Sequence, residues 1–150
     1  MKPWSWPAAA SAPPPPVLIL DENFSEHEVS RLRKRRVRLR VIGVDLAAKG
    51  ADDAEVLLPL LHRLKQPTFF TRDRDFWRQE LGHRRYGLVF VGAGERPGEA
   101  AGLILRFLGD VRFRTHAGRA GRVVHLHPEG ITWWEPGDRQ PRRVPWPPGA

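Results

Sequence analysis

Carboxylates are concentrated in three separate segments of this sequence. Asp21 directly follows one apolar run, Asp73 and Asp75 follow a second, and Asp53 belongs to a third acidic group, Asp-Asp-Ala-Glu. Grouped carboxylates repel one another unless a cation is present, and Mg²⁺ or Mn²⁺ prefers such oxygen ligands. The residue types therefore predict a metal site whose bound water attacks a phosphodiester. A structural alternative stays open, because aspartate also caps helices and follows strands.

The apolar patterns predict the elements that position these acids. Short runs rich in Val, Leu, Ile and Phe are typical of strands buried on both faces of a parallel sheet. Apolar residues at a spacing of 3.6, after a capping residue, predict helices. The expected strands are 17–20, 39–44, 68–71 and 88–91, and the expected helices begin near Ser25, near Asp52 or Asp53, and near Pro97.

Two local features qualify this pattern. Ser25 and Glu28 have the spacing of a capping box, whereas Pro59 lies inside the second expected helix and should kink or restart it. The alternation of strands and helices predicts a three-layer α/β fold with a mainly parallel central sheet. In such a sheet the carboxyl ends of the strands share one edge, so the three acidic segments are expected to meet there.

The C-terminal third has a different pattern. The segments 123–127 and 131–135 flank Pro-Glu-Gly and predict a β-hairpin. Both ends of the chain are rich in proline, which suits extended or disordered tails. The expected organisation is a tail at 1–16, a domain at 17–135 (core 17–108, hairpin extension 109–135) and a second tail at 136–150.

Three motifs in order resemble a known family. LILDEN at 18–23, GADDAEV at 50–56 and FTRDRDF at 70–76 are similar to a PIN-like domain, in a subgroup related to VapC-type toxins. The resemblance covers roughly residues 17–108. It implies a metal-dependent nuclease that cuts single-stranded RNA, plausible as the toxin of a toxin–antitoxin pair.

The resemblance also assigns roles. It implies that Asp21, Asp53, Asp73 and Asp75 are the catalytic acids that hold Mg²⁺ or Mn²⁺. Asn23 and Thr71 would orient the site. An antitoxin protein and a second copy of the chain are the protein partners that it allows. The sequence departs from many such toxins in lacking a clear further acid nearer the C-terminus, where Glu95, Glu99 and Asp110 are weak candidates.

Basic residues support a nucleic-acid partner. The chain carries 25 Lys and Arg against 17 Asp and Glu, a formal charge of +8. The segment 31–40 is strongly basic, and a solvated helix face is its structural alternative. A second group of arginines flanks the acids and is better placed to hold RNA phosphates. The expected RNA-binding residues are Arg72, Arg74, Arg78, Arg84 and Arg85.

Other features narrow the function further. The absence of cysteine excludes disulfides and thiolate sites, and no apolar run has the length of a membrane span. With no secretory signal, a cytoplasmic protein without membrane contact is expected.

His125 and His127 share one strand face but have no third ligand nearby in sequence. Trp77 could stack on an unpaired base, although an aromatic after a strand is more often part of the core.

Three alternatives remain beside the nuclease. A receiver-type signalling domain needs a lysine on a late strand, and no lysine follows Lys65. A topoisomerase-primase-like module would use Glu22 with Asp73 and Asp75, but lacks the glycine expected beside the glutamate. The third is a PIN-like module that binds RNA or protein without cutting, which nothing in the sequence excludes.

Overall fold

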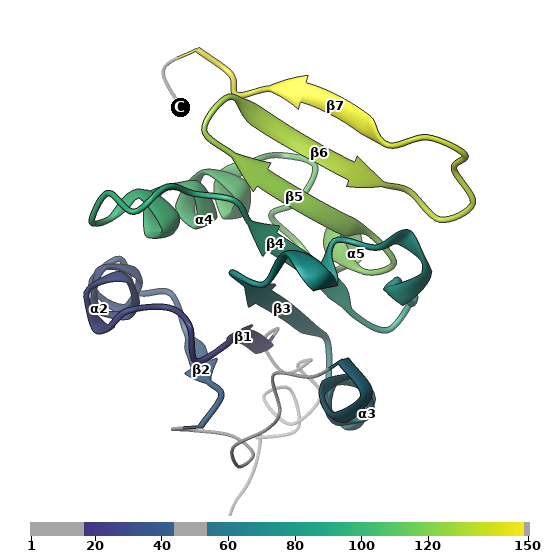
Figure 1. The fold of residues 1–150 in the computed structure, drawn as a ribbon, viewed down its shortest axis with the longest axis horizontal. Coiled ribbons are helices and arrows are strands. Elements are labelled where there is room, and N and C mark those ends of the chain that lie inside the picture. The colour runs from purple at the N-terminus through teal and green to yellow at the C-terminus, as the bar shows by residue number, and fades with distance from the viewer. Residues whose placement is uncertain (1–16, 44–53, 149–150) are drawn as a thin grey trace, which may run out of the picture.

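The computed structural model describes residues 17–43 and 54–148, which contain a seven-stranded sheet with helices on both sides (Figure 1). The strands are β1 (Val17–Leu20), β2 (Leu39–Val41), β3 (Pro67–Thr71), β4 (Gly87–Val91), β5 (Val123–His127), β6 (Gly130–Trp134) and β7 (Arg142–Pro145). They lie in the order β2-β1-β3-β4-β5-β6-β7. The strands β1 to β5 pair with one another in parallel, and the β5–β6 and β6–β7 pairs are antiparallel. The expected α/β class with a mainly parallel sheet is confirmed.

Helices cover both faces of the parallel strands. They are α2 (Glu26–Lys34), α3 (Ala54–Arg63), α4 (Glu99–Gly109) and α5 (His116–Arg119), with short 3₁₀ turns η1 (Arg74–Phe76) and η2 (Gln79–Leu81). Figure 1 shows α2 and α4 on one side of the sheet and α3 on the other. This arrangement is consistent with three layers.

Each side of the sheet has its own apolar core. On the α2 and α4 side, Leu32 and Phe107 pack with Phe70, whereas Leu57 on α3 packs with Phe69 on the opposite side. Because successive strand residues point to opposite faces, neighbouring Phe69 and Phe70 contribute to different cores. Every residue of β3 and β4 is buried. Continuous apolar runs on these two strands follow from burial on both faces.

A buried carboxylate joins α2 to α4. Glu28 is only 6% exposed, and its carboxylate oxygens accept hydrogen bonds from the backbone N–H groups of Gly98 and Ala101 at the start of α4. Ser25 caps α2 as expected, through the Glu28 N–H at 3.3 Å. A capping box also requires the Glu28 carboxylate to accept from the Ser25 N–H. That part of the prediction is wrong, because the Glu28 carboxylate accepts from the backbone N–H groups at the start of α4 instead.

The structure differs from the predicted elements at three other places. The second strand ends at Val41 instead of continuing to residue 44, which itself lies outside the described residues. The helix α3 runs through Pro59 without restarting. Within the expected tail at 136–150, β7 pairs with β6, and the Trp146 indole N–H donates to the His127 carbonyl at 2.8 Å. Proline is tolerated there because β7 is an edge strand.

Candidate functional site

Asp21 lies at the carboxyl end of β1, directly beside the end of β3. It is 2% exposed, and its backbone N–H donates to the Phe70 carbonyl at 3.1 Å. Both carboxylate oxygens accept hydrogen bonds: Oδ1 accepts from the Asn23 N–H at 3.0 Å, and Oδ2 accepts from the Thr71 hydroxyl and from the Arg72 N–H at 3.2 Å. The sheet edge thus holds this carboxylate in one orientation.

The electrostatics of Asp21 reflect its burial. Desolvation raises the pKa of the Asp21 carboxyl above its ordinary value, and the hydrogen bonds from Thr71, Asn23 and Arg72 oppose that rise. A nearby cation would stabilise the charged form of such a carboxylate. A buried acid at the end of a parallel strand, oriented by three donors, is therefore suited to contact a cation.

Thr71 connects Asp21 to the second acidic segment. Its Oγ1 donates to the Asp21 carboxylate and accepts from the Asp73 N–H at 2.9 Å. The Asp73 side chain in turn accepts from the Asp75 N–H at 2.9 Å and caps η1. We call Asp21, Thr71, Asp73 and Asp75 the acidic site. Its backbone is ordered by side chains of the site itself.

The structure brings the predicted residues together only in part. Asp21, Thr71 and Asp73 form one hydrogen-bonded chain, and Asn23 joins it through its backbone N–H. Asp75 is exposed beside them. The predicted fourth acid, Asp53, lies outside the described residues. Within residues 17–43 and 54–148, no group of three His, Cys, Asp or Glu side chains is arranged to hold a metal ion.

The donor set nonetheless fits a hard divalent cation. Mg²⁺ is usually held by one or two carboxylates and keeps several of its waters. Asp21 and Asp73 supply carboxylate oxygen at the ends of two adjacent strands. Imidazole and thiolate, which zinc prefers, are absent from the acidic site. The residues therefore suit Mg²⁺ or Mn²⁺ better than zinc.

The predicted RNA-binding arginines divide into two kinds. Arg72 is engaged internally, because its Nη2 donates to the Ala93 and Gly94 carbonyls at 2.6 and 3.5 Å. It fixes the loop after β4 against the acidic site, and its buried Nε has no hydrogen-bond partner among the described residues. The other four predicted arginines are exposed. They are Arg74, Arg78, Arg84 and Arg85.

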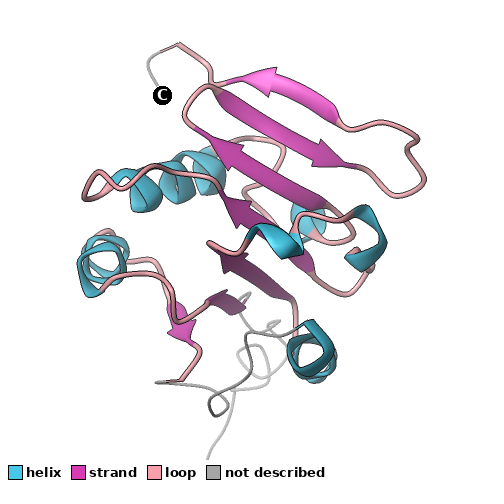
Figure 2. Cartoon of the chain, in the orientation of Figure 1, coloured by secondary structure: helices cyan, strands magenta, loops and turns pink. Residues whose placement is uncertain are grey.

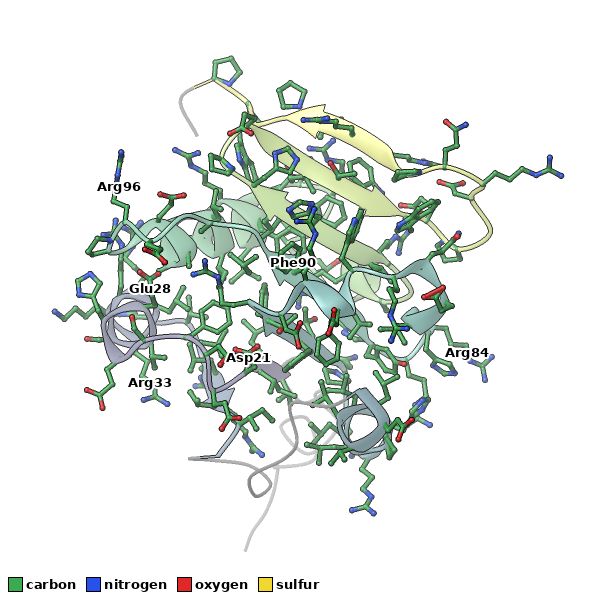
Figure 3. The ribbon with its side chains drawn as sticks, in the orientation of Figure 1. Asp21, Glu28, Arg33, Arg84, Phe90 and Arg96 are labelled. Carbon is green, nitrogen blue, oxygen red and sulfur yellow. The ribbon has the colours of Figure 1, made fainter. Side chains whose placement is uncertain are left out.

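Figure 3 shows how charge is distributed around this edge. Asp21 lies near the centre of the view, Arg84 projects on one side, and Arg33 and Arg96 lie near α2 and the loop before α4 on the other. The Arg78 Nε donates to the Asp75 carbonyl at 3.0 Å, so its guanidinium is held close to η1. Exposed positive charge therefore lies on the same segment as the acids.

Sequence reasoning missed a cluster of rings beside this site. Trp77, at the end of η1, lies 5.4 Å from the His125 ring and 6.5 Å from the Trp134 ring. The Phe90 ring lies 4.7 Å from the His125 ring, and the His127 ring lies 5.2 Å from the His125 ring. The shared strand face of the two histidines was visible in the sequence. Their proximity to Trp77 was not, because it depends on how η1 folds over β4.

Comparison with family models, with curated proteins and with solved structures finds no match to this chain. Among the described helices, none combines the length and the apolar character needed to cross a bilayer. The chemistry of the acidic site is therefore inferred from its geometry and its motifs.

Proposed function

We propose that this chain is a Mg²⁺- or Mn²⁺-dependent endoribonuclease of PIN-like type, which cuts single-stranded RNA and acts as the toxin of a toxin–antitoxin pair. The observation that carries the proposal is the hydrogen-bonded chain from Asp21 through Thr71 to Asp73. It holds carboxylates at the ends of two adjacent parallel strands, where ligands bind in open α/β sheets.

Each residue of the acidic site has a distinct part in this proposal. Asp21 and Asp73 would hold the metal, together with Asp53 and Asp75, which the resemblance adds. A bound Mg²⁺ or Mn²⁺ lowers the pKa of a coordinated water and neutralises charge on the phosphate. Thr71 keeps the Asp21 carboxylate in place and fixes the turn that carries Asp73. The exposed Arg74 and Arg78 would bind the RNA backbone.

A second function has its own supporting observation. A PIN-like module that binds RNA without cutting it is the competing proposal, because the exposed arginines beside the acidic site would bind phosphates with or without a metal. It requires the same positive surface but no metal. Cleavage and binding therefore need to be measured separately.

The decisive experiment is cleavage of end-labelled single-stranded RNA with Mn²⁺ by wild type and Asp73→Asn. Asparagine keeps an oxygen that can accept from the Asp75 N–H, and it is as good a capping residue as aspartate. The substitution thus removes charge without removing the cap. We expect cleavage to fall about 100-fold or more, which corresponds to about 2.7 kcal/mol of transition-state stabilisation.

A matched control is Glu26→Gln, because Glu26 is an exposed acid on α2 that belongs neither to the acidic site nor to the segment carrying the assigned arginines. We expect it to cleave like wild type, and EDTA to abolish cleavage by both. Equal cleavage by wild type and Asp73→Asn would contradict the assigned site. RNA binding without cleavage by the wild type would favour the non-catalytic module.

A further inference from the structure

A continuous row of side chains crosses the sheet from the acidic site to its antiparallel edge. Thr71 on β3 pairs with Phe90 on β4, and Phe90 pairs with His125 on β5. His125 then pairs with Thr132 on β6, and Thr132 pairs with Arg143 on β7. Residues in register on neighbouring strands share one face. The row therefore begins beside Asp21 and ends at an arginine on the edge strand.

Exposure increases along this row. Thr71 and Phe90 are buried, His125 and Thr132 are partly exposed, and Arg143 is exposed. With strands about 4.8 Å apart, four steps from β3 to β7 span about 19 Å. Its accessible part, from His125 on β5 to Arg143 on β7, covers two of these steps, about 10 Å, and can contact an extended polymer that continues past the acidic site.

Aromatic rings lie along the row in a cluster that we call the aromatic face: Trp77, Phe90, His125, His127 and Trp134, of which Phe90 and His127 are buried. Their ring centroids are 4.7 to 6.5 Å apart along the chain of contacts. Trp77 and Trp134 are partly exposed. A hollow of about 270 Å³ lies beside Trp134 and is also lined by Gln79, His83 and Arg84. The face thus offers rings and a recess at its border.

The charge around the aromatic face is mainly positive. Desolvation lowers the pKa of His125 to about 4, and His127, Arg74 and Arg143 act electrostatically in the same direction. The imidazole is consequently neutral near pH 7 and contributes a ring, while the arginines contribute the charge. Acids also lie at its border: the Glu129 carboxylate lies 3.8 Å from His127 Nδ1, and Glu135, which pairs with Arg122, lines the hollow beside Trp134.

Neutral rings flanked by guanidinium groups suit one class of ligand. Unpaired bases stack on aromatic side chains, and arginine binds the phosphates between them. A four-stranded sheet can stack two or three bases in this way. An acidic peptide would use the arginines but would leave the rings without a partner.

We propose that the aromatic face binds the bases of single-stranded RNA adjacent to the phosphodiester bond at the acidic site. Trp77, His125 and Trp134 contact bases, and Arg74 and Arg143 contact the phosphates of the same strand. This inference rests on the proposed function, since it places the scissile bond at Asp21 and Asp73. Beyond the proposed function, the inference identifies the surface that holds the substrate strand.

The test measures binding without cleavage. Anisotropy of a 5′-labelled 12-nucleotide oligouridine is recorded in EDTA with the full chain and its variants. Trp134→Leu keeps an apolar side chain but removes the large ring. We expect it to weaken binding about tenfold, the loss of one base–aromatic contact. A thermal melt of the same sample shows that the variant is folded.

A pair of neighbouring arginines supplies the matched control. Arg143 lies in the row, whereas Arg142 alternates to the other face of β7 and its Nε donates to Asp138 at 2.9 Å. We expect Arg143→Ala to reduce the slope of log affinity against log salt by about 0.7, the value for one single-strand phosphate. Arg142→Ala should change neither the affinity nor the slope by a comparable amount.

The outcomes separate this inference from the proposed function. If wild type cleaves RNA and Asp73→Asn does not, yet a folded Trp134→Leu binds like wild type, the aromatic face is wrong and the nuclease stands. If no protein cleaves but Trp134→Leu and Arg143→Ala both weaken binding, base binding by the face is supported and the nuclease is wrong. Dimerisation of wild type that Trp134→Leu abolishes, with RNA binding unchanged, would overturn the inference in favour of a second copy.

Discussion

The parallel and antiparallel halves of the sheet differ in how far their polar and aromatic groups are buried. In the parallel half, Asp21 and Glu28 are buried and accept hydrogen bonds from several donors each. In the antiparallel half, which comprises β5, β6 and β7, His125 and Trp134 remain partly exposed on the face opposite α4. Figure 2 shows the helices grouped around the parallel strands, with β7 at the far edge.

This difference has a physical consequence for function. A carboxylate that must meet a cation in one geometry benefits from a rigid, fully hydrogen-bonded setting. Rings that stack on bases need an open surface instead. The parallel half is therefore suited to position the reacting groups, and the antiparallel half to hold a strand of variable sequence.

The largest effect on stability is expected from replacing Glu28, which connects α2 to the start of α4 beside the parallel strands. In Glu28→Ala, the backbone N–H groups of Gly98 and Ala101 lose their acceptors where water reaches them poorly. Each buried donor left unsatisfied costs about 1–3 kcal/mol. We expect the free energy of unfolding, measured with urea, to fall by about 2–5 kcal/mol.

Glu26→Ala is the control for this prediction, because Glu26 is exposed on the same helix. It should change stability by less than about 0.5 kcal/mol. Equal, small effects of the two substitutions would show that Glu28 does not fasten α2 to α4.

The predictable part of the fold is the part built from local apolar runs. The segments 17–20, 68–71 and 88–91 fall within β1, β3 and β4, because burial on both faces leaves a continuous apolar signal. The strand β7 gives no such signal: only Val144 is apolar between its arginines and Pro145. Its pairing with β6 is a tertiary effect.

The candidate site shows the same limit. Asp21, Thr71 and Asp73 were predictable neighbours, since the ends of parallel strands share one edge. The row from Thr71 to Arg143 was not, because it requires the register of five strands at once. Arg72 was assigned to RNA by its position beside the acids, whereas its guanidinium is engaged by the Ala93 and Gly94 carbonyls. Side-chain partners of this kind depend on loops that the sequence pattern does not position.

A smaller and more selective effect is expected at Gly92, which lies against the aromatic face. A Cβ at this position would lie 2.5 Å from His125 Nε2, so Gly92→Ala must displace the imidazole. We expect weaker oligouridine binding, by a smaller factor than in Trp134→Leu.

Gly102→Ala is the matched control, since its Cβ meets nothing within 4 Å. Glycine within a helix is destabilising relative to alanine by about 0.5–1 kcal/mol. Gly102→Ala should therefore stabilise α4 and leave RNA binding unchanged. Unaltered binding by Gly92→Ala would show that the position of the His125 ring is unimportant.

A further effect is expected in the acid dependence of stability. Burial lowers the pKa of His125 from 6.5 to about 4, with His127, Arg74 and Arg143 acting in the same direction. Between these two pH values the unfolded chain binds the proton and the folded chain does not. The contribution of His125 to stability is therefore present above about pH 6.5 and is lost as the pH falls toward 4.

His125→Gln removes this titration while retaining a polar side chain. The urea midpoint should fall less between pH 7 and pH 5 in the variant than in wild type, so the two midpoints converge or cross as the solution is acidified. An identical fall in both proteins would mean that His125 is solvated and protonates freely in the folded state. The ring would then carry charge in the aromatic face, and its contact with RNA would be that of a cation with phosphate instead of a neutral ring with a base.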